Sequence, residues 1–200
     1  MAKALVAEQR TLRRAQAHAA TRSAILDAAR RVAARDGSRD LSLRGVAAEA
    51  GFAPAALYGY FAGKDDLLLA LAADDLTALA RTMREAAAQH LGPGRLAAAA
   101  SSALTALRET ESLAAAVGAM SAGTGGSDAE RLFNGRMIAA LKVLSDASGK
   151  PVSSREDQCD VVLVAAAVTG LALLARSGRL EALGFTPDEI LARLDAKFAG

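Results

Sequence analysis

Residues 41–68 read LSLRGVAAEAGFAPAALYGYFAGKDDLL, and this stretch decides the fold of the chain. Ser42 can accept a hydrogen bond from the backbone at the start of a helix over residues 43–50. Gly51 is suited to end that helix, because glycine adopts the left-handed conformation at low cost. Pro54 fits the first position of a following helix, where its missing N–H would have no partner anyway. The stretch therefore predicts two short helices joined by a tight turn.

A longer helix is predicted ahead of this pair, over residues 21–37. Apolar residues recur there at the spacing of one helix face: Ile25, Leu26, Ala29, Val32 and Ala33. The second short helix is predicted to end near Phe61, before Ala62 and Gly63. Three helices in this order form a helix-turn-helix pattern, in which one helix enters the major groove of DNA and its neighbours brace it on the phosphate backbone.

The composition favours helix along the whole chain. Hydrophobic residues make up 52% of the 200 residues, and 51 residues are alanine, which is the best helix former and a poor strand former. We therefore expect an all-α chain of about nine helices with no strand. Further helices are predicted over residues 64–89, 95–107 and 111–122, and after capping-box spacings at Ser127/Glu130, Ser153/Glu156 and Thr186/Glu189. The predicted organisation has three parts, residues 1–20, 21–64 and 65–200.

The small net charge of +2 hides an asymmetry along the chain. Residues 1–64 hold eleven Lys or Arg against five Asp or Glu, a balance of +6, whereas residues 65–200 carry a balance of −4. A basic N-terminal third is typical of a module that binds a polyanion. An arginine-rich helix face exposed to water gives the same count, so charge alone leaves both interpretations open.

The residues of the N-terminal third match a known family pattern. They are Ile25-Leu26-x-Ala28-Ala29, Gly37 and Leu41-Ser42-Leu43-Arg44-x-Val46-Ala47-x-x-Ala50-Gly51-Phe52-Ala53-Pro54-x-x-Leu57-Tyr58-x-Tyr60-Phe61-x-x-Lys64-Asp65-x-Leu67-Leu68. This pattern resembles the tetracycline-repressor (TetR) family of bacterial regulators over about residues 21–70. The resemblance implies a homodimeric, ligand-responsive repressor with a three-helix DNA-binding domain for a palindromic operator on double-stranded DNA. It also implies a helical C-terminal domain, residues 65–200, that dimerises and holds a small effector whose binding releases the DNA.

The resemblance also implies which residues contact DNA. The family positions that hold phosphates are Ser42, Tyr58, Tyr60 and Lys64; those near base edges are Pro54, Ala55 and Ala56; and Arg44 is able to reach a base. Each has an alternative role in packing or solvation. Ala53 stands where the family often has Ser or Thr, and Gly59 stands where a side chain usually contacts DNA.

The segment 53–59 contains no Arg, Lys, Asn or Gln, so it cannot make bidentate contacts with bases. We hypothesise that the sequence is read by contact of Ala55 and Ala56 with thymine methyl groups, by Arg44 and by DNA shape. Residues 1–20 are interpreted as a partly ordered basic arm. Its Arg10, Arg13 and Arg14 either enter an adjacent minor groove or lie in solvent.

Residues 161–174 are apolar nearly all round, which predicts a helix buried on more than one side. In a TetR-like chain this helix and the last one, about residues 187–198, form a four-helix bundle across the dimer two-fold; the alternative is an internal core helix of a monomer. The predicted dimer residues are Val162, Ala165, Ala166, Thr169, Gly170, Leu173, Ile190 and Leu194.

An effector pocket would be lined by aliphatic and methionine side chains, because few aromatic residues remain outside the helix-turn-helix. The candidates are Met83, Met120, Phe133 and Met137, each of which could equally fill a core. A small apolar, aliphatic effector is expected rather than a planar dye. The alternative function is a helical interaction or dimerisation module without an effector.

No enzyme, metal site or cofactor is expected. His18 and His90 are the only histidines and lack metal-ligand spacing, and the nucleophile-elbow and phosphate-loop motifs are missing. The sequence shows no signal-peptide pattern and no apolar stretch of 18 to 20 residues, so no contact with a membrane is expected. The single Cys159 fits a reducing compartment, and we expect a cytoplasmic protein.

Overall fold

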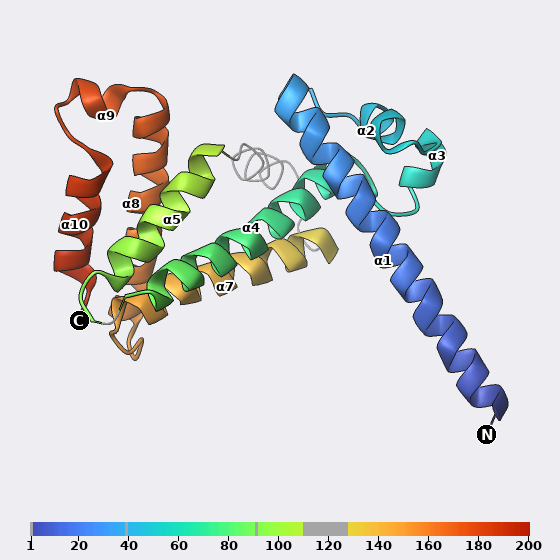
Figure 1. Cartoon of the computed structure of the whole chain (residues 1–200), viewed down its shortest axis with the longest axis horizontal. Helices are drawn as coiled ribbons and strands as arrows, with labels where there is room; N and C mark the ends of the chain where they lie inside the picture. Colours follow the sequence, from blue (N-terminus) through green and yellow to red (C-terminus); the bar gives the residue numbers. More distant parts are fainter. Residues whose placement is uncertain (1, 39, 91, 110–127) are drawn as a thin grey trace.

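The computed structural model describes residues 2–38, 40–90, 92–109 and 128–200, and the side chains of the first helix from residue 8 onward. This described part is helical with no strand (Figure 1). Its helices are α1 (Ala2–Asp36), α2 (Leu43–Ala50), α3 (Pro54–Leu57), α4 (Lys64–Ala88), α5 (Arg95–Glu109), α7 (Asp128–Ser148), α8 (Arg155–Arg176), α9 (Arg179–Ala182) and α10 (Pro187–Phe198). The predicted all-α class is confirmed.

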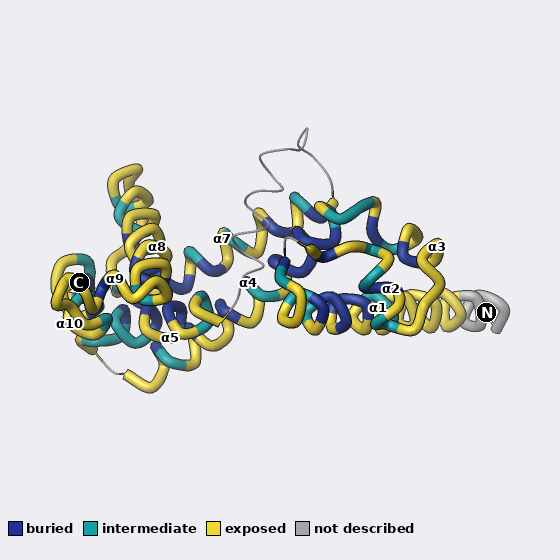
Figure 2. Tube along the Cα trace, turned by 90° about the horizontal axis from the view of Figure 1, so that it is seen from above, coloured by how far each residue is buried: buried dark blue, intermediate teal, exposed yellow. Residues whose placement is uncertain are grey.

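One end of the molecule is built by α1, α2 and α3, and the other by α8, α9 and α10, with α4 and α7 running between them (Figure 1). Residues 2–20, predicted as a partly ordered arm, are the first part of a 35-residue helix that continues to Asp36. Their helix propensity explains the continuity. Side chains 8–20 are exposed, so this part of α1 extends beyond the packed body (Figure 2).

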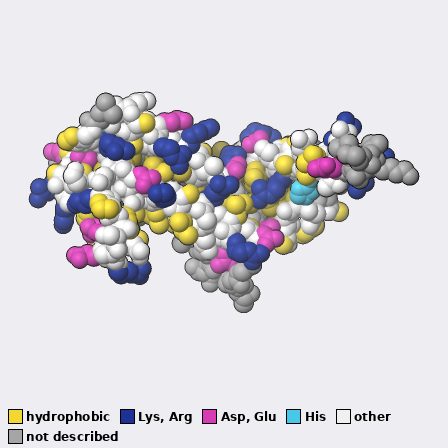
Figure 3. Space-filling model, turned by 90° about the horizontal axis from the view of Figure 1, so that it is seen from below, with side chains coloured by type: hydrophobic (Ala, Val, Ile, Leu, Met, Phe, Trp, Pro, Cys, Tyr) yellow, Lys and Arg dark blue, Asp and Glu magenta, His cyan; other side chains and the backbone are white. Residues whose placement is uncertain are grey.

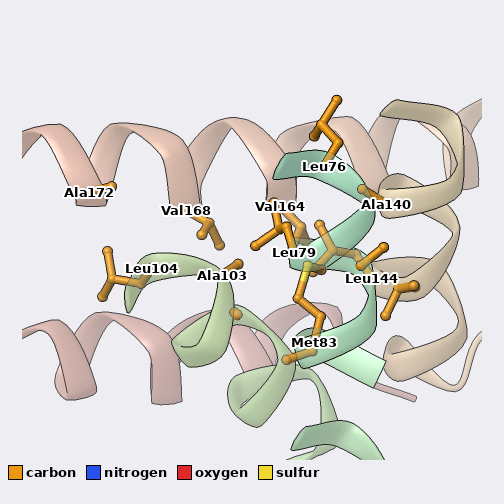
Figure 4. Close-up of a cluster of buried hydrophobic side chains, with 14 of the residues drawn as sticks. Leu76, Leu79, Met83, Ala103, Leu104, Ala140, Leu144, Val164, Val168 and Ala172 are labelled. Atoms are coloured by element: carbon orange, nitrogen blue, oxygen red, sulfur yellow. The ribbon is translucent and has the colours of Figure 1, made fainter. Parts of the chain in front are cut away.

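Two clusters of buried apolar side chains hold the fold together, and α4 contributes to both. The first joins α1, α2 and α3 to the start of α4 and ends at Leu71. The second joins the rest of α4 to α5, α7, α8, α9 and α10 (Figure 4). Because one continuous helix carries residues of both clusters, a shift of α4 is transmitted to both ends of the molecule.

Three local predictions need correction. The second short helix ends at Leu57 rather than near Phe61, and turns follow it up to Tyr60, because Gly59 is a poor helix residue. The capping box predicted at Ser153 lies one residue later, at Ser154 with Asp157. The short helix α9 was not predicted at all.

Other local predictions are confirmed or lie outside the described residues. The capping box at Thr186 and Glu189 is present with Pro187 in the first turn. Gly37 and Gly51 have left-handed φ values of 87° and 74° at helix ends. The helix predicted over residues 111–122 and the cap at Ser127 lie outside the described residues.

Candidate nucleic-acid interface and ligand cavity

The turn between α2 and α3 is fixed at both ends by local backbone chemistry. The Ser42 hydroxyl accepts a hydrogen bond from the Gly45 backbone N–H at 3.1 Å, which leaves its own hydrogen available to a phosphate oxygen. The Gly51 N–H and the Phe52 N–H donate back to α2 carbonyls, so the chain turns sharply into α3. Ala53 caps α3 without a side-chain hydrogen bond. The helix-turn-helix expected from the sequence is therefore present.

The outer face of α3 is small and apolar. Pro54, Ala55 and Ala56 are exposed, whereas Leu57 and Phe61 are buried in the first apolar cluster. Tyr58 is 64% exposed at the C-terminal end of α3. With the helix anchored by Leu57 and Phe61, this face presents methyl groups and one phenol to whatever lies opposite. That arrangement suits contact with thymine methyl groups and phosphates rather than bidentate base pairing.

Two residues of α1 lie against the segment that follows α3. The His18 ring stacks on the Tyr60 ring with centroids 4.6 Å apart and an interplanar angle of 25°. One turn later, the Arg22 guanidinium carbon lies 5.2 Å from the centre of the Phe61 ring. Sequence reasoning missed the role of His18, since its partner lies more than forty residues away and only the fold joins them. These contacts hold Tyr60 half-buried at the edge of α3.

The basic excess of the N-terminal third is partly neutralised. Arg31 and Arg35 both bind the carboxylate of Glu49 in α2, at 2.7 and 3.1 Å, and these hydrogen bonds lower the pKa of Glu49. Hydrogen bonds to Asp36 and then Glu49 raise the pKa of Arg35. On the face drawn in Figure 3, Lys and Arg side chains are spread over both ends of the molecule rather than gathered in one patch.

Arg44 is a different case. Its side chain is exposed on α2, and no ion pair with another described residue involves it. Lys64 lies half-buried at the first position of α4. The exposed Arg10, Arg13 and Arg14 lie on α1, and an α-helix about 10 to 12 Å wide does not fit a minor groove about 6 Å wide. In this conformation only their side chains, and not the helix that carries them, could enter a minor groove, so the minor-groove hypothesis stays a prediction.

A cavity of about 450 Å³ lies between α4, α5, α7 and α8. Apolar side chains from these four helices converge around it (Figure 4). Three predicted pocket residues, Met83, Phe133 and Met137, line this cavity, and Met120 lies outside the described residues. Among the described residues that line it, Thr169 and Arg176 are polar. A volume of this size, apolar and with few polar groups, suits a small ligand with an aliphatic body.

The outward face of α8 exposes apolar side chains. Val162 is 56% and Leu173 67% exposed, and Ala166, Thr169 and Gly170 are exposed beside them. This differs from the expectation of a helix buried on several sides, because within one chain α8 packs mainly through Val164, Val168, Leu171 and Ala172. Ala165 and Ile190 are half-buried. Leu194 lies in the interior of its own protomer, so we leave it out of the proposed dimer surface.

The pattern of the bacterial regulatory proteins of the tetR family matches residues 25–71, which contain this helix-turn-helix and end at the last residue of the first apolar cluster. This N-terminal segment therefore matches the DNA-binding domain of the tetR family. No curated protein matches it in sequence.

Solved structures of TetR-like fold resemble the chain over nearly its whole length. A protein of unknown function from Rhodococcus sp. RHA1 is 23% identical with a TM-score of 0.68, covering 89% of this chain and 93% of its own. A TetR transcriptional regulator from the same organism is 19% identical, with a TM-score of 0.64 and coverages of 90% and 95%. FadR from Bacillus subtilis, solved in complex with stearoyl-CoA, is 17% identical, with a TM-score of 0.61 and coverages of 89% and 97%.

Proposed function

We propose that the chain is a homodimeric repressor that binds a palindromic operator and is released from it by a small aliphatic effector. In this proposal residues 21–64 bind DNA, and residues 65–200 dimerise and bind the effector. The observation that carries the DNA-binding half is the exposed face of α3, held on the buried Leu57 and Phe61 beside the exposed Tyr58. A helix braced in this way is what insertion into the major groove requires.

Several side chains around α3 support the proposed contacts. Ser42, Tyr58 and Tyr60 carry hydroxyl groups on or next to this face, and Lys64 begins α4 just behind it. Each is able to donate to a phosphate oxygen. Arg44, exposed and outside the ion-pair network, is the residue we assign to a base. Pro54, Ala55 and Ala56 provide apolar contact with base edges.

The proposed dimer surface is the exposed apolar face of α8, named here by Val162, Ala166, Gly170 and Leu173. By length and composition α8 is also apolar enough to cross a membrane, with a mean hydropathy of 2.0 in a window that is only 22% buried. In a chain of the TetR family, cover by a second copy explains such a face better. Two DNA-binding ends held in one dimer then match two half-sites about one helical turn apart.

The apolar cavity supports an aliphatic effector. Its lining from Leu76, Met83 and Met137 offers dispersion contacts and flexible methionines that adapt to a chain. FadR from Bacillus subtilis, which shares the fold, was solved with stearoyl-CoA. For this chain we propose an aliphatic compound of a size that fits about 450 Å³. If the ligand binds more tightly to the conformation that binds DNA poorly, it shifts the protein toward that conformation and the operator is released.

Fluorescence anisotropy tests the proposal with a labelled duplex from upstream of the protein's own gene, at two salt concentrations. We expect binding that survives excess competitor DNA, has a two-fold symmetric footprint and is reversed by decanoate but not by butanoate. Binding that high salt and competitor DNA erase would favour the alternative, a helical interaction module that retains a helix-turn-helix. A specific complex unaffected by aliphatic acids and alcohols would remove the effector from the proposal.

A further inference from the structure

We propose that a second copy of the chain forms the missing wall of the cavity, so that a bound ligand is enclosed by both protomers. This inference rests on the dimer proposed above and assigns part of the ligand site to the partner. It begins with the place where the cavity meets solvent. The cavity spans residues of α4, α5, α7 and α8, yet only one of these helices contributes exposed lining residues.

The exposed lining residues are Thr169, Gly170, Leu173 and Arg176, and all four belong to α8. The lining residues of α4, α5 and α7 are buried or half-buried. They include the buried Leu79 of α4 and the half-buried Met137 of α7. Among the described residues, solvent therefore reaches the cavity along the last two turns of α8, and the lining residues of the other three helices are covered within one chain.

The opening coincides with the proposed dimer surface. Thr169, Gly170 and Leu173 line the cavity, and they also lie on the face of α8 that continues through Ala166 to Val162. A copy that covers this face necessarily covers the opening. Since α8 rises about 1.5 Å per residue, the face from Val162 to Leu173 is about 16 Å long, enough for a helix to lie across it.

The side chains around the opening are better suited to contact with another protein surface than to contact with water. The Thr169 hydroxyl donates to the carbonyl of Ala165 at 2.8 Å, so its hydrogen is used within the helix. A Cβ added at Gly170 would meet no heavy atom within 4 Å, which leaves room for close approach of another helix. The Leu173 side chain is 67% exposed to water. Its burial against an apolar surface would be favourable.

A second copy is the occupant that fits this face. The first turn of α8 carries Glu156 and Asp157, and its last turn carries Arg176. A two-fold axis that passes perpendicular to α8 through the centre of this face makes the two α8 helices run antiparallel. The first turn, which is net acidic although it also contains Arg155, then lies beside the basic last turn of the partner helix. The small Ala166 and Gly170 between the large Val162 and Leu173 allow the helices to approach closely at the centre of the contact.

This arrangement couples ligand binding to dimerisation. A ligand held by both protomers stabilises the dimer, and by linkage the dimer binds the ligand more tightly than the monomer does. The cavity would also be sealed from bulk solvent only in the dimer. Sealing can be measured without knowing the natural ligand.

The test uses a cysteine inside the cavity as a reporter in the full chain. Cys159 is exposed, so it is first changed by Cys159→Ser to remove background labelling. Met137→Cys then places a thiol in the cavity wall of α7, and its labelling by a bulky maleimide is timed. Val162→Glu, at a position that does not line the cavity, is expected to break the dimer by burying a charge. We expect labelling at least tenfold faster in this monomer than in the parent dimer.

Ile138→Cys provides the matched control, since Ile138 is the next residue of α7, is 66% exposed and does not line the cavity. Its labelling should be fast and equal in both backgrounds. Ala166→Arg is a second dimer-breaking variant, for use if circular dichroism shows that Val162→Glu does not fold.

Light scattering gives the oligomeric state in each background. A parent dimer with Met137→Cys labelled as fast as in the monomeric variant would overturn the shared cavity and leave the proposed dimer standing. A monomeric parent would overturn the dimer of the proposed function itself.

Discussion

Arg30 of α1 is hydrogen-bonded to Asp75 of α4, with its Nε 3.2 Å from the carboxylate. A second nitrogen of the same guanidinium donates to Asp74 at 2.8 Å. Burial opposes the charged form of Arg30, but the hydrogen bonds to Asp74 and Asp75 outweigh it, so the pKa of Arg30 is raised. The residue after Asp75 is Leu76, which lines the cavity. The link between the DNA-binding helices and α4 therefore begins one residue from the proposed ligand.

Arg30→Gln should weaken this link. We expect unfolding in urea to become easier by about 1 kcal/mol, because two adjacent carboxylates lose a shared cation in a partly exposed network. We also expect decanoate to displace operator DNA less effectively, since movement of α4 would then be passed to α1 through the apolar cluster alone. Arg81→Gln, an exposed arginine of α4 outside this network, is the control and should behave as wild type in both assays.

Arg44 and Lys64 should differ in what they contribute to DNA binding. Arg44→Ala is expected to cost about 1 to 3 kcal/mol of discrimination between the operator and single-base variants, because it removes a base contact. Lys64→Gln should weaken binding to all sequences and reduce the slope of log affinity against log salt by about one. Anisotropy titrations at several salt concentrations measure both. If Arg44→Ala weakened all sequences equally, Arg44 would be a phosphate contact.

Filling the cavity should remove ligand binding without harming DNA binding. Ala165 is half-buried in the α8 wall of the cavity, and Ala165→Phe projects a ring into the open volume. We expect calorimetry to show decanoate binding lost by more than tenfold while operator affinity changes little. Ala139→Phe, at an exposed position of α7 outside the cavity, is the size-matched control. Undiminished decanoate binding by Ala165→Phe would place the ligand elsewhere.

The cap of α8 predicts a dependence of stability on pH. Hydrogen bonds from the Ser153 backbone and from Ser154 lower the pKa of Asp157 to about 2. Since this value is below that of the unfolded chain, about 3.9, the carboxylate stabilises the fold above pH 4, and this contribution is lost as pH falls through about 2. Asp157→Asn should therefore be less stable than wild type at pH 7, and the difference in thermal midpoint should shrink in acid. Asp160→Asn, on the same helix, controls for loss of a negative charge.

Two glycines near α3 should respond to alanine in opposite directions. Gly51 has a φ of 74°, so Gly51→Ala forces a side chain into the left-handed region and should cost about 1 kcal/mol. Gly59 lies outside that region, and a Cβ there meets only the Ala56 carbonyl oxygen at 3.4 Å. Gly59→Ala should stabilise by up to about 1 kcal/mol and extend α3. Urea unfolding and amide exchange of residues 58–60 check both expectations.

Much of this fold is predictable from local sequence signals. Ser42, Gly51 and Pro54 act within a few residues of themselves, so their effects on α2 and α3 can be predicted without knowing the rest of the chain. The same holds for the cap at Thr186. The one-residue error at Ser154 arose because aspartate, as well as glutamate, can complete a capping box.

The site depends on contacts that no local pattern reveals. His18 stacks on Tyr60, and Arg30 reaches Asp75, across more than forty residues of sequence. The exposure of α8 was also unpredictable, because an apolar helix buried within a chain and one covered by a second copy have the same composition. Which face of α8 stays exposed becomes clear only from the positions of the helices that pack against it.

Because α1 is one unbroken helix, a small rotation at the DNA-binding end displaces its N-terminal tip by a larger distance. Its 35 residues span about 50 Å, and the side chains from 8 to 20 are exposed, with His18 stacked on Tyr60 near the base of this extension. A rotation of this end by about five degrees would sweep the tip of the helix through about 4 Å. A spin label or fluorophore near the tip would thus magnify a change at α3 too small to detect there.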